Sequence, residues 1–424
     1  MKKIFTFLLM IITSLTFVAC KNTPGLTTSK SNLLNSVRYS SSGSNTKIDD
    51  EEYLQKLYEF SNTIYQMTST YEDGNYALSP LSIYMALSVL HSLGDDGVKS
   101  DIETLFGMTA EDLDKTGSLF LSLIRELKEK DFDGNENVTS KLDLTNSIWI
   151  DDQIKTNQNA LDRIAEDLFC YAYQTPFSSN VAQANKDIHD FIYEKTNGLI
   201  DSDFELDEQT LFAIINTLYF KDCWGFDDLP TETLQFNTNK GTKNCEFLKA
   251  NYISGDVAET DYSYYLYATT KQGYKIKFIV PKENHTLSEA MSARNLNEVN
   301  SRKNYVNEKE KDIYTRCVFP SFRIESETKL KDILMQNNYL GNAFSGYTSD
   351  LMDRSLVVSE ILHKAVVNVD KKGIEGAAYT IIFTKETAAT PHKNTKDFVI
   401  DKNFGFLITT EDDIILFEGQ VVNP

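Results

Sequence analysis

The chain has 424 residues, of which 41% are hydrophobic and 12% aromatic, which is enough apolar material for a large folded core. Its formal net charge of −20 at pH 7 argues against a nucleic-acid partner, because phosphate backbones are held by basic surfaces. No CxxC motif or Cys/His spacing typical of a metal site occurs, so we expect neither a metal nor another cofactor.

Residues 1–20 have the pattern of a targeting signal. Lys2 and Lys3 precede an apolar stretch, residues 4–18, that is too short to be read as a membrane span. The segment ends at Ala19-Cys20, which resembles the processing site of a bacterial lipoprotein with Cys20 as lipid anchor. We therefore expect the protein in the bacterial cell envelope, lipid-anchored to the outer membrane and either periplasmic or surface-exposed. Ordinary secretion is the alternative.

Residues 21–48 are rich in Ser, Thr and Asn and carry basic but no acidic side chains, which predicts a flexible tether. A single domain is expected over residues 49–424, because no second linker and no internal repeat follows. The other four cysteines are expected as free thiols, since a domain of this size needs no disulfides. They are Cys170, Cys223, Cys245 and Cys317.

Helical patterns dominate the first part of the domain. Apolar residues at helical spacing behind four acids predict a helix over residues 49–67. Ser79 is suited to cap a helix with Pro80 at its first position and Gly94 as its stop. This helix is apolar on nearly all sides, so it should be buried. Further helices are expected to end near Gly107 and to cover residues 182–194 and 330–336.

Strand patterns alternate with these helices. Residues 142–150 alternate between polar and apolar, whereas residues 211–220 form a nearly continuous apolar run interrupted by Asn216 and Thr217. Such a run fits a central strand buried on both faces, in which Asn216 needs a hydrogen-bond partner. Shorter strands are predicted over residues 274–280, 314–319 and 365–369. The fold class is therefore mixed α/β (α+β).

The segment after residue 369 has two characters. From Gly373 the residues divide at period two, which predicts a strand with one buried face. The face fit for burial holds Ile374, Gly376, Ala378, Thr380, Ile382 and Thr384. This strand leads into residues 387–391, which read as an exposed and cleavable loop. A strand joined to a cleavable loop suggests a segment with two states.

Six matches in chain order resemble signatures of the serpin family, serine protease inhibitors. They are residues 75–82, 194–198, 216–221, Trp224, residues 319–325 and residues 419–424. The resemblance covers residues 53–424. It implies a serpin fold with a large central β-sheet, two smaller sheets and about nine helices, and an exposed reactive-centre loop over about residues 371–392.

The resemblance also implies an inhibitor and not an enzyme. In agreement with this, the sequence contains no GxSxG or HExxH motif. In that family a protease cleaves the loop, and the upstream part then inserts into the central sheet as a strand and traps the acyl-enzyme. We expect a monomeric suicide inhibitor of serine proteases, extending to cysteine proteases, that meets the membrane only through its lipid. A non-inhibitory serpin-fold surface lipoprotein acting as a binding module is the alternative.

The family's spacing, counted from Gly373, places the cleaved bond between Thr387 and Ala388. Small residues there favour an elastase-like or broad-specificity target such as a subtilisin-like enzyme. Cleavage after Lys385, by a trypsin-like enzyme, or after Glu386 stays open. The insertion hinge that the family implies is Gly373, Ile374, Glu375, Gly376, Ala377 and Ala378. No proline interrupts residues 373–390, so insertion is not blocked.

The family further implies a group of residues where the central sheet opens. They are Ser79, Ser82, Asn216, His363 and Trp224. From the residues alone, His363 is a candidate hydrogen-bond partner for Asn216, as a gate and not as a catalyst. Lys371 and Lys372 stand where acids are common in the family, so a salt bridge at the top of the sheet is expected to be absent or reversed.

Overall fold

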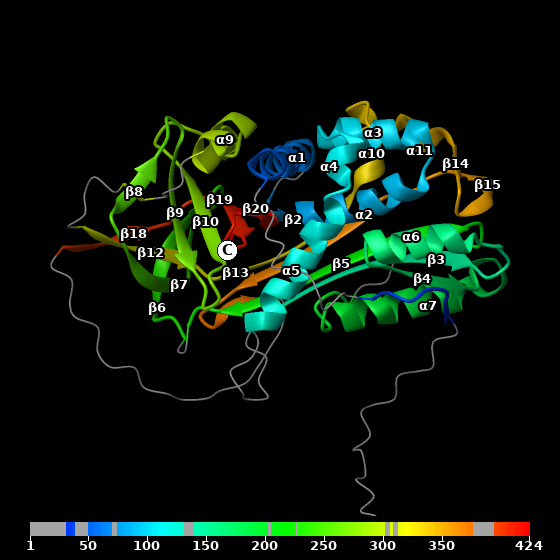
Figure 1. Ribbon diagram of the computed structural model, residues 1–424. Helices are drawn as coiled ribbons and strands as arrows, with labels where there is room; N and C mark the ends of the chain where they lie inside the picture. The colour runs from blue at the N-terminus through cyan, green and yellow to red at the C-terminus, as the bar shows by residue number, and fades with distance from the viewer. Residues whose placement is uncertain are drawn as a thin grey trace, which may run out of the picture.

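The computed structural model describes residues 31–38, 50–69, 74–130, 140–201, 205–225, 228–301, 306–307, 313–375 and 394–424. Cys20 lies outside the described residues, as do the hinge positions 376–378 and the candidate cleavage positions 385–388. The described part is elongated (Figure 1). A long sheet with helices on both faces makes one end, and further sheets make the other.

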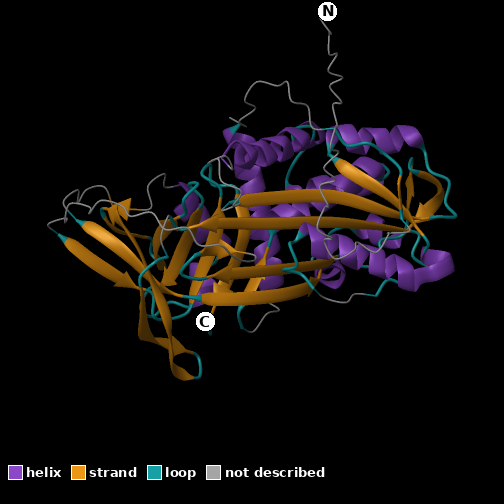
Figure 2. Cartoon of the chain, turned by 90° about the horizontal axis from the view of Figure 1, so that it is seen from below, coloured by secondary structure: helices purple, strands orange, loops and turns teal. Residues whose placement is uncertain are grey.

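Seven strands form the central sheet, in the spatial order β1-β4-β3-β5-β17-β16-β13. They are β1 (Asn32–Leu33), β3 (Lys141–Asp151), β4 (Cys170–Thr175), β5 (Phe212–Cys223), β13 (Phe322–Lys329), β16 (Leu362–Val369) and β17 (Gly373–Glu375). β3 and β5 pair antiparallel in one unbroken register, from Lys141 opposite Lys221 to Ile150 opposite Phe212. Figure 2 shows long strands crossing the molecule side by side. The large central sheet expected from the sequence is confirmed.

The environment of β5 differs from the one its apolar run predicts. Tyr219 and Phe220 are buried, but residues 212–216 are only partly buried. The reason is the pairing of β5: β3 covers one edge along most of the strand, whereas among the described residues the other edge pairs only with the three residues of β17. The prediction of burial on both faces is therefore wrong for the first half of the strand.

A second sheet also has seven strands, in the order β11-β8-β9-β10-β19-β20-β2, so it matches the central sheet in strand number. Its strands are β2 (Tyr76–Leu78), β8 (Asp256–Glu259), β9 (Ser263–Thr269), β10 (Lys275–Pro281), β11 (Val306–Asn307), β19 (Phe404–Thr409) and β20 (Ile415–Val421). A four-stranded sheet contains β6 (Thr231–Thr238), β7 (Gly241–Ser254), β12 (Tyr314–Pro320) and β18 (Thr395–Val399). β14 (Tyr347–Ser349) pairs with β15 (Met352–Leu356).

Helices cover both faces of the central sheet, with α7 on the face opposite α2 and α5 (Figure 1). The helices are α1 (Glu51–Ser69), α2 (Pro80–Leu93), α3 (Asp96–Phe106), α4 (Ala110–Leu113), α5 (Thr116–Lys130), α6 (Gln158–Asp167), α7 (Phe177–Lys195), α8 (Leu287–Ala290), α9 (Ala293–Ser301), α10 (Leu330–Gln336) and α11 (Gly341–Ser345). α7 begins at Phe177 and not at the predicted residue 182, because the helix includes a turn that precedes a kink at Asn180.

α2 is the buried helix that its composition predicts. The Ser79 side chain accepts a hydrogen bond from the Ser82 amide, Pro80 occupies the first position, and Gly94 follows the last residue. The helix packs against β5, so its polar first turn is brought to the middle of the central sheet.

Part of the expected flexible tether is instead ordered against the domain. Asn32 and Leu33 pair with Tyr173 and Gln174 of β4, which makes β1 the outermost strand of the central sheet. The buried side chain of Asn35 donates to the carbonyl oxygens of Leu161 (3.1 Å) and Cys170 (2.9 Å). Composition alone did not show this, because the edge of β4 supplies the partners.

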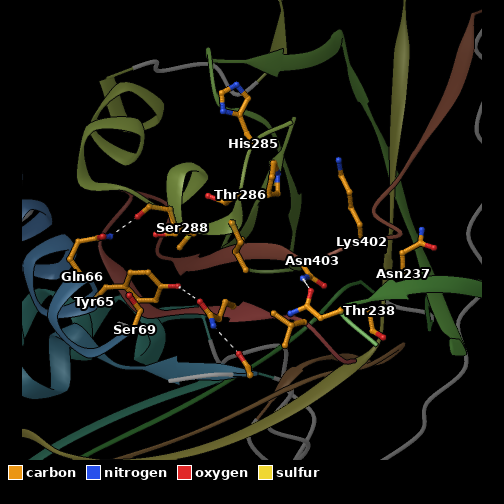
Figure 3. Close-up of a pocket in the computed structure, with 17 residues that line it drawn as sticks. Tyr65, Gln66, Ser69, Asn237, Thr238, His285, Thr286, Ser288, Lys402 and Asn403 are labelled. Carbon is orange, nitrogen blue, oxygen red and sulfur yellow. Dashed lines mark hydrogen bonds between the residues drawn. The ribbon is translucent and has the colours of Figure 1, made fainter. Parts of the chain in front are cut away.

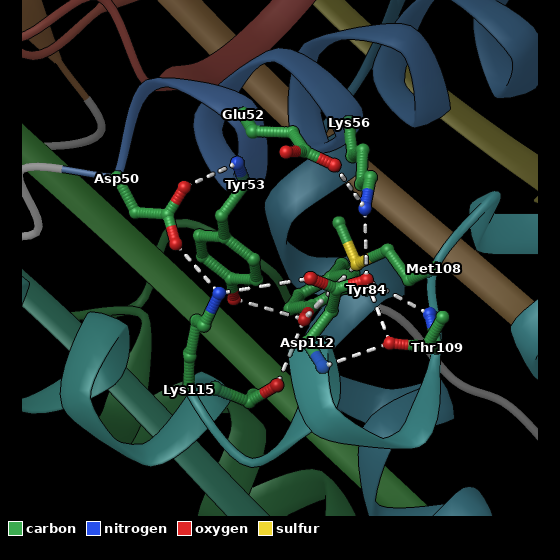
Figure 4. Close-up of polar contacts among 10 residues, drawn as sticks. Asp50, Glu52, Tyr53, Lys56, Tyr84, Met108, Thr109, Asp112 and Lys115 are labelled. Carbon is green, nitrogen blue, oxygen red and sulfur yellow. Dashed lines mark hydrogen bonds and ion pairs between the residues drawn. The ribbon is translucent and has the colours of Figure 1, made fainter.

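A polar cluster lies at the start of α1 (Figure 4). One carboxylate oxygen of Asp50 accepts from the Tyr53 amide (3.0 Å), and the other contacts Lys115 Nζ (2.6 Å). Lys115 and Lys56 both approach Asp112, whose pKa is lowered to about 2, chiefly by the hydrogen bond from the Thr109 amide. These contacts join the start of α1 to α4 and α5.

Candidate functional site

A tight turn delivers the chain from β16 into β17. Asp370 holds the turn: its backbone amide donates to the Gly373 carbonyl (3.1 Å), and its carboxylate accepts from the amides of Lys372 (2.7 Å) and Gly373 (3.3 Å). A Cβ atom on Gly373 would collide with the carbonyl oxygen of Asp222, so only glycine fits the entry point.

β17 lies between β5 and β16 and pairs antiparallel with both. Gly373, Ile374 and Glu375 stand opposite Cys223, Asp222 and Lys221 of β5, and Ile374 and Glu375 also stand opposite residues of β16. Below β17, the described strands leave a gap: β16 pairs only with β13 over residues 362–367, and β5 pairs only with β3 over residues 212–220. Among the described residues, neither of these two strand edges has a pairing partner below β17.

The first two side chains of β17 follow the alternation that the sequence predicts. Ile374 is buried beside a small hollow lined by Leu218 and Phe220 of β5 and Val366 of β16. Glu375 points to the other face, where its carboxylate contacts Lys221 Nζ (3.0 Å) and accepts from the Tyr219 hydroxyl (3.3 Å). Burial, together with the proximity of Glu375, raises the pKa of Tyr219.

Trp224 lies at the turn above β17 and not in the cluster with Ser79. Its indole Nε1 donates to the Asp370 carbonyl (2.6 Å), and its backbone amide donates to the Lys372 carbonyl (3.2 Å). Lys371 of the same turn pairs with Asp228 (3.5 Å). The basic partner of this ion pair therefore belongs to the turn before β17, and the acidic partner does not. Trp224 therefore anchors the point where the loop enters the sheet.

The other four residues of the expected sheet-opening group come together at the start of α2. Ser79 donates its backbone amide to His363 Nε2 (3.0 Å). The Ser82 hydroxyl donates to Asn216 Oδ1 (2.5 Å). The α2 first turn is thus hydrogen-bonded to β16 through His363 and to β5 through Asn216, the two strands that flank the gap.

Asn216 finds its second partner in the neighbouring strand. Its Nδ2 donates to Asn146 Oδ1 (2.6 Å), and Asn146 Nδ2 donates to the Leu168 carbonyl (3.2 Å). His363 is therefore not the partner of Asn216, because the histidine ring is used by Ser79. Sequence reasoning missed Asn146. The signal was present: Asn146 and Asn216 are polar interruptions of two strands and stand directly opposite each other.

His363 is held neutral in this cluster. Burial alone lowers its pKa to about 4, because a charged imidazolium would be desolvated without a facing carboxylate. A neutral ring with an acceptor nitrogen turned to the Ser79 amide holds α2 to β16 and offers no proton at neutral pH. The arrangement is suited to positioning two strands and not to acid–base catalysis.

The described residues contain no group of three or more His, Cys, Asp or Glu side chains placed to hold a metal ion. Within the same residues, no helix combines the length and apolar character needed to cross a membrane. The four cysteines of the domain are unbridged, with Cys170 and Cys317 buried.

The family model for the serpins, serine protease inhibitors, matches residues 55–424. Serpin-ZX of Arabidopsis thaliana is 25% identical, over 84% of this chain and 94% of the relative. Serpin A3-8 of Bos taurus is 28% identical, over 89% of this chain and 90% of the relative.

Solved structures agree in fold. The thermophilic serpin tengpin in its native state has a TM-score of 0.70 at 22% identity and covers 89% of this chain and 96% of its own. Arabidopsis AtSerpin1 in its native stressed conformation has a TM-score of 0.69 at 21% identity and covers 89% of this chain and 99% of its own. Because the family model spans most of the sequence and the sheets have the expected arrangement, the chain belongs to the serpin family.

Proposed function

We propose that this serpin traps serine proteases covalently: its loop is cleaved between Thr387 and Ala388 and then inserts between β5 and β16. The observation that carries the proposal is the place of β17. The first residues of the loop segment already lie between these two strands, and both strands have unpaired edges below it in the described residues.

The register of β17 sets the path of insertion. Since Glu375 stands opposite Lys221 and Asn368, a strand continued in the same register brings residue 381 opposite Leu362 and residue 384 opposite Phe212. A strand spanning β5 from Cys223 to Phe212 at about 3.3 Å per residue carries an attached protease roughly 40 Å. That distance is comparable to the length of a domain of this size.

The chemical step precedes the movement. The protease serine attacks the carbonyl carbon of Thr387, an ester bond forms, and the amine of Ala388 leaves with the downstream part of the chain. Inhibition requires insertion before water hydrolyses the ester. The loop side chains at alternate positions from Ile374 are uncharged and mostly small, which favours rapid entry into the sheet.

The nature of the cleaved bond supports an elastase-like or subtilisin-like target, since both flanking residues are small. Cleavage after Lys385 by a trypsin-like enzyme, or after Glu386, is the competing assignment. We also propose that Cys20 anchors the protein to a bacterial membrane, on the basis of the signal-like residues 1–20. Incorporation of labelled fatty acid that is lost in Cys20→Ala tests the anchor.

The full-length protein, mixed separately with elastase, subtilisin, trypsin and a glutamyl endopeptidase, tests the function. We expect an SDS-stable band at the summed masses and a released peptide that begins at Ala388. Ala378→Arg should abolish the band and leave a cleaved inhibitor, because Ala378 shares the buried face with Ile374. Ala377→Arg, on the opposite face, is the matched control and should still trap.

Cleavage by all four enzymes without a stable band would overturn the inhibitory proposal. The non-inhibitory binding role would then be the better description. Equal behaviour of the two arginine variants would show that the alternation of β17 does not continue into the loop.

A further inference from the structure

A hollow of about 540 Å³ lies beside the second sheet (Figure 3), and none of its described lining residues belongs to β17. It is bounded by the end of α1 at Tyr65, the turn after β6 at Asn239, the start of α8 at Thr286, and β20 at Gln420. This volume is within the usual range for small-ligand sites, about 300–1,000 Å³.

The lining is polar in an unusual way for so acidic a chain. Among the residues that the structure describes, the lining contains five carboxamides, five hydroxyl groups, one lysine and one histidine, and no carboxylate. The net charge of the whole chain is −20. The acid of α8, Glu289, contacts two lining residues: it accepts from the Thr286 amide (2.7 Å) and hydroxyl (3.0 Å) and lies 3.5 Å from His285 Nδ1. The described lining therefore presents hydrogen-bonding groups and the positive charge of Lys402.

Two adjacent lining residues, Lys402 and Asn403, differ from the rest of the wall in their ion pairing and hydrogen bonding. Lys402 forms no ion pair with any residue that the structure describes. Asn403 donates through Nδ2 to Asn239 Oδ1 (2.6 Å), which fixes its orientation, but its own Oδ1 is buried without a hydrogen-bond partner. A buried acceptor without a donor is uncommon and costs stability unless a water or ligand supplies the donor.

The rest of the wall is held in place before any ligand arrives. The Tyr65 hydroxyl donates to Gln420 Oε1 (3.1 Å), and Gln420 Nε2 donates to the Gly74 carbonyl (2.8 Å). Leu287 and Met291 supply apolar surface between the polar groups. Such a mixture suits a compact carbon skeleton that carries several hydroxyl groups.

We propose that this hollow is a binding site for a small hydroxylated organic anion of the sugar-acid type. The ligand carboxylate pairs with Lys402, and the ligand hydroxyls exchange hydrogen bonds with the carboxamides of the lining. The site is separate from the gap beside β17, so it does not depend on protease trapping.

Isothermal titration of the full-length protein with D-glucuronate tests the proposal. D-Glucose, which keeps the ring and hydroxyls, and hexanoate, which keeps the charge, are the matched ligands. We expect glucuronate to bind at least about tenfold more tightly than either, because only it offers both a carboxylate to Lys402 and hydroxyl groups to the carboxamides.

Lys402→Met should weaken glucuronate binding about tenfold through loss of the charged partner. Lys240→Met, a turn residue that does not line the hollow, should bind as the parent does. Absence of glucuronate binding, equal binding of hexanoate, or an unchanged affinity of Lys402→Met would each overturn the proposal.

Discussion

The central sheet has two kinds of strand edge, one covered by another segment of the chain and one largely unpaired in the part of the chain that the structure describes. The outer edge of β4 is covered by β1, a piece of chain from before the domain, and is pinned by the side chain of Asn35. Among the described residues, the edges of β5 and β16 inside the sheet are joined only by the three residues of β17. An open outer edge invites association with other chains, whereas the inner gap is the place where we propose that the protein's own loop inserts.

The largest effect should come from filling the inner gap. Cutting the loop with a protease that escapes trapping frees the upstream segment to insert over about nine further residues. About two new backbone hydrogen bonds per residue, less the entropy of ordering, give a net gain of about 5 kcal/mol and a rise in Tm of about 10 °C. Calorimetry before and after cleavage measures this. An unchanged Tm would mean that the gap does not accept the loop.

The next effect concerns His363, which bonds α2 to the β16 side of the gap. Its pKa is about 4 in the folded protein and 6.5 in its unperturbed state. Between these values only the unfolded chain takes up the proton, so stability is complete above pH 6.5 and falls as the pH drops to 4, by about 3 kcal/mol.

Urea unfolding at pH 7 and at pH 4.5 measures this slope. His363→Gln retains an acceptor for the Ser79 amide and has no titration in this range, so it should lose that part of the pH dependence. Equal slopes in parent and variant would show that His363 is not buried neutral in solution.

At the outer edge, Asn35→Ala should cost about 2 kcal/mol locally, since it strips hydrogen bonds from two carbonyl groups and from the Ala172 amide. Hydrogen exchange at the Ala172 amide should accelerate about 30-fold. Ser36→Ala, at an exposed neighbour, is the control. If exchange is as fast in the parent as in Asn35→Ala, β1 is not held on the sheet.

The smallest effect is expected at Glu375. Its pair with Lys221 is largely shielded from solvent, and Glu375→Gln should loosen β17 by about 1 kcal/mol without unfolding the domain. Trp224 contacts the turn before β17, so its fluorescence reports the change during a mild denaturant titration. Identical titration curves for parent and variant would show that backbone pairing alone stabilises β17.

Local chemistry in the sequence was sufficient for the individual elements. The cap and proline at Ser79 and Pro80 predicted the start of α2, the apolar girdle of that helix predicted its burial, and α10 spans the predicted residues 330–336. The alternation after Gly373 correctly separated buried Ile374 from half-buried Glu375. These features depend on hydrogen bonds and solvent exposure within one or two turns of chain.

Pairings between distant segments needed the tertiary structure. Asn216 was expected to need a partner, but whether this was His363 or Asn146 depended on which strands became neighbours. The docking of residues 31–38 likewise depended on a free edge at β4, which their own composition does not encode.

The sequence by itself determined the element types, the family resemblance and the two-faced strand after Gly373, because periodicity and capping are local. Only the tertiary structure decided that β17 lies between β5 and β16, and that Trp224 stands at its entry. The physical reason is that a sheet is completed by backbone groups far apart in the chain, and any of several edges could have received the same strand.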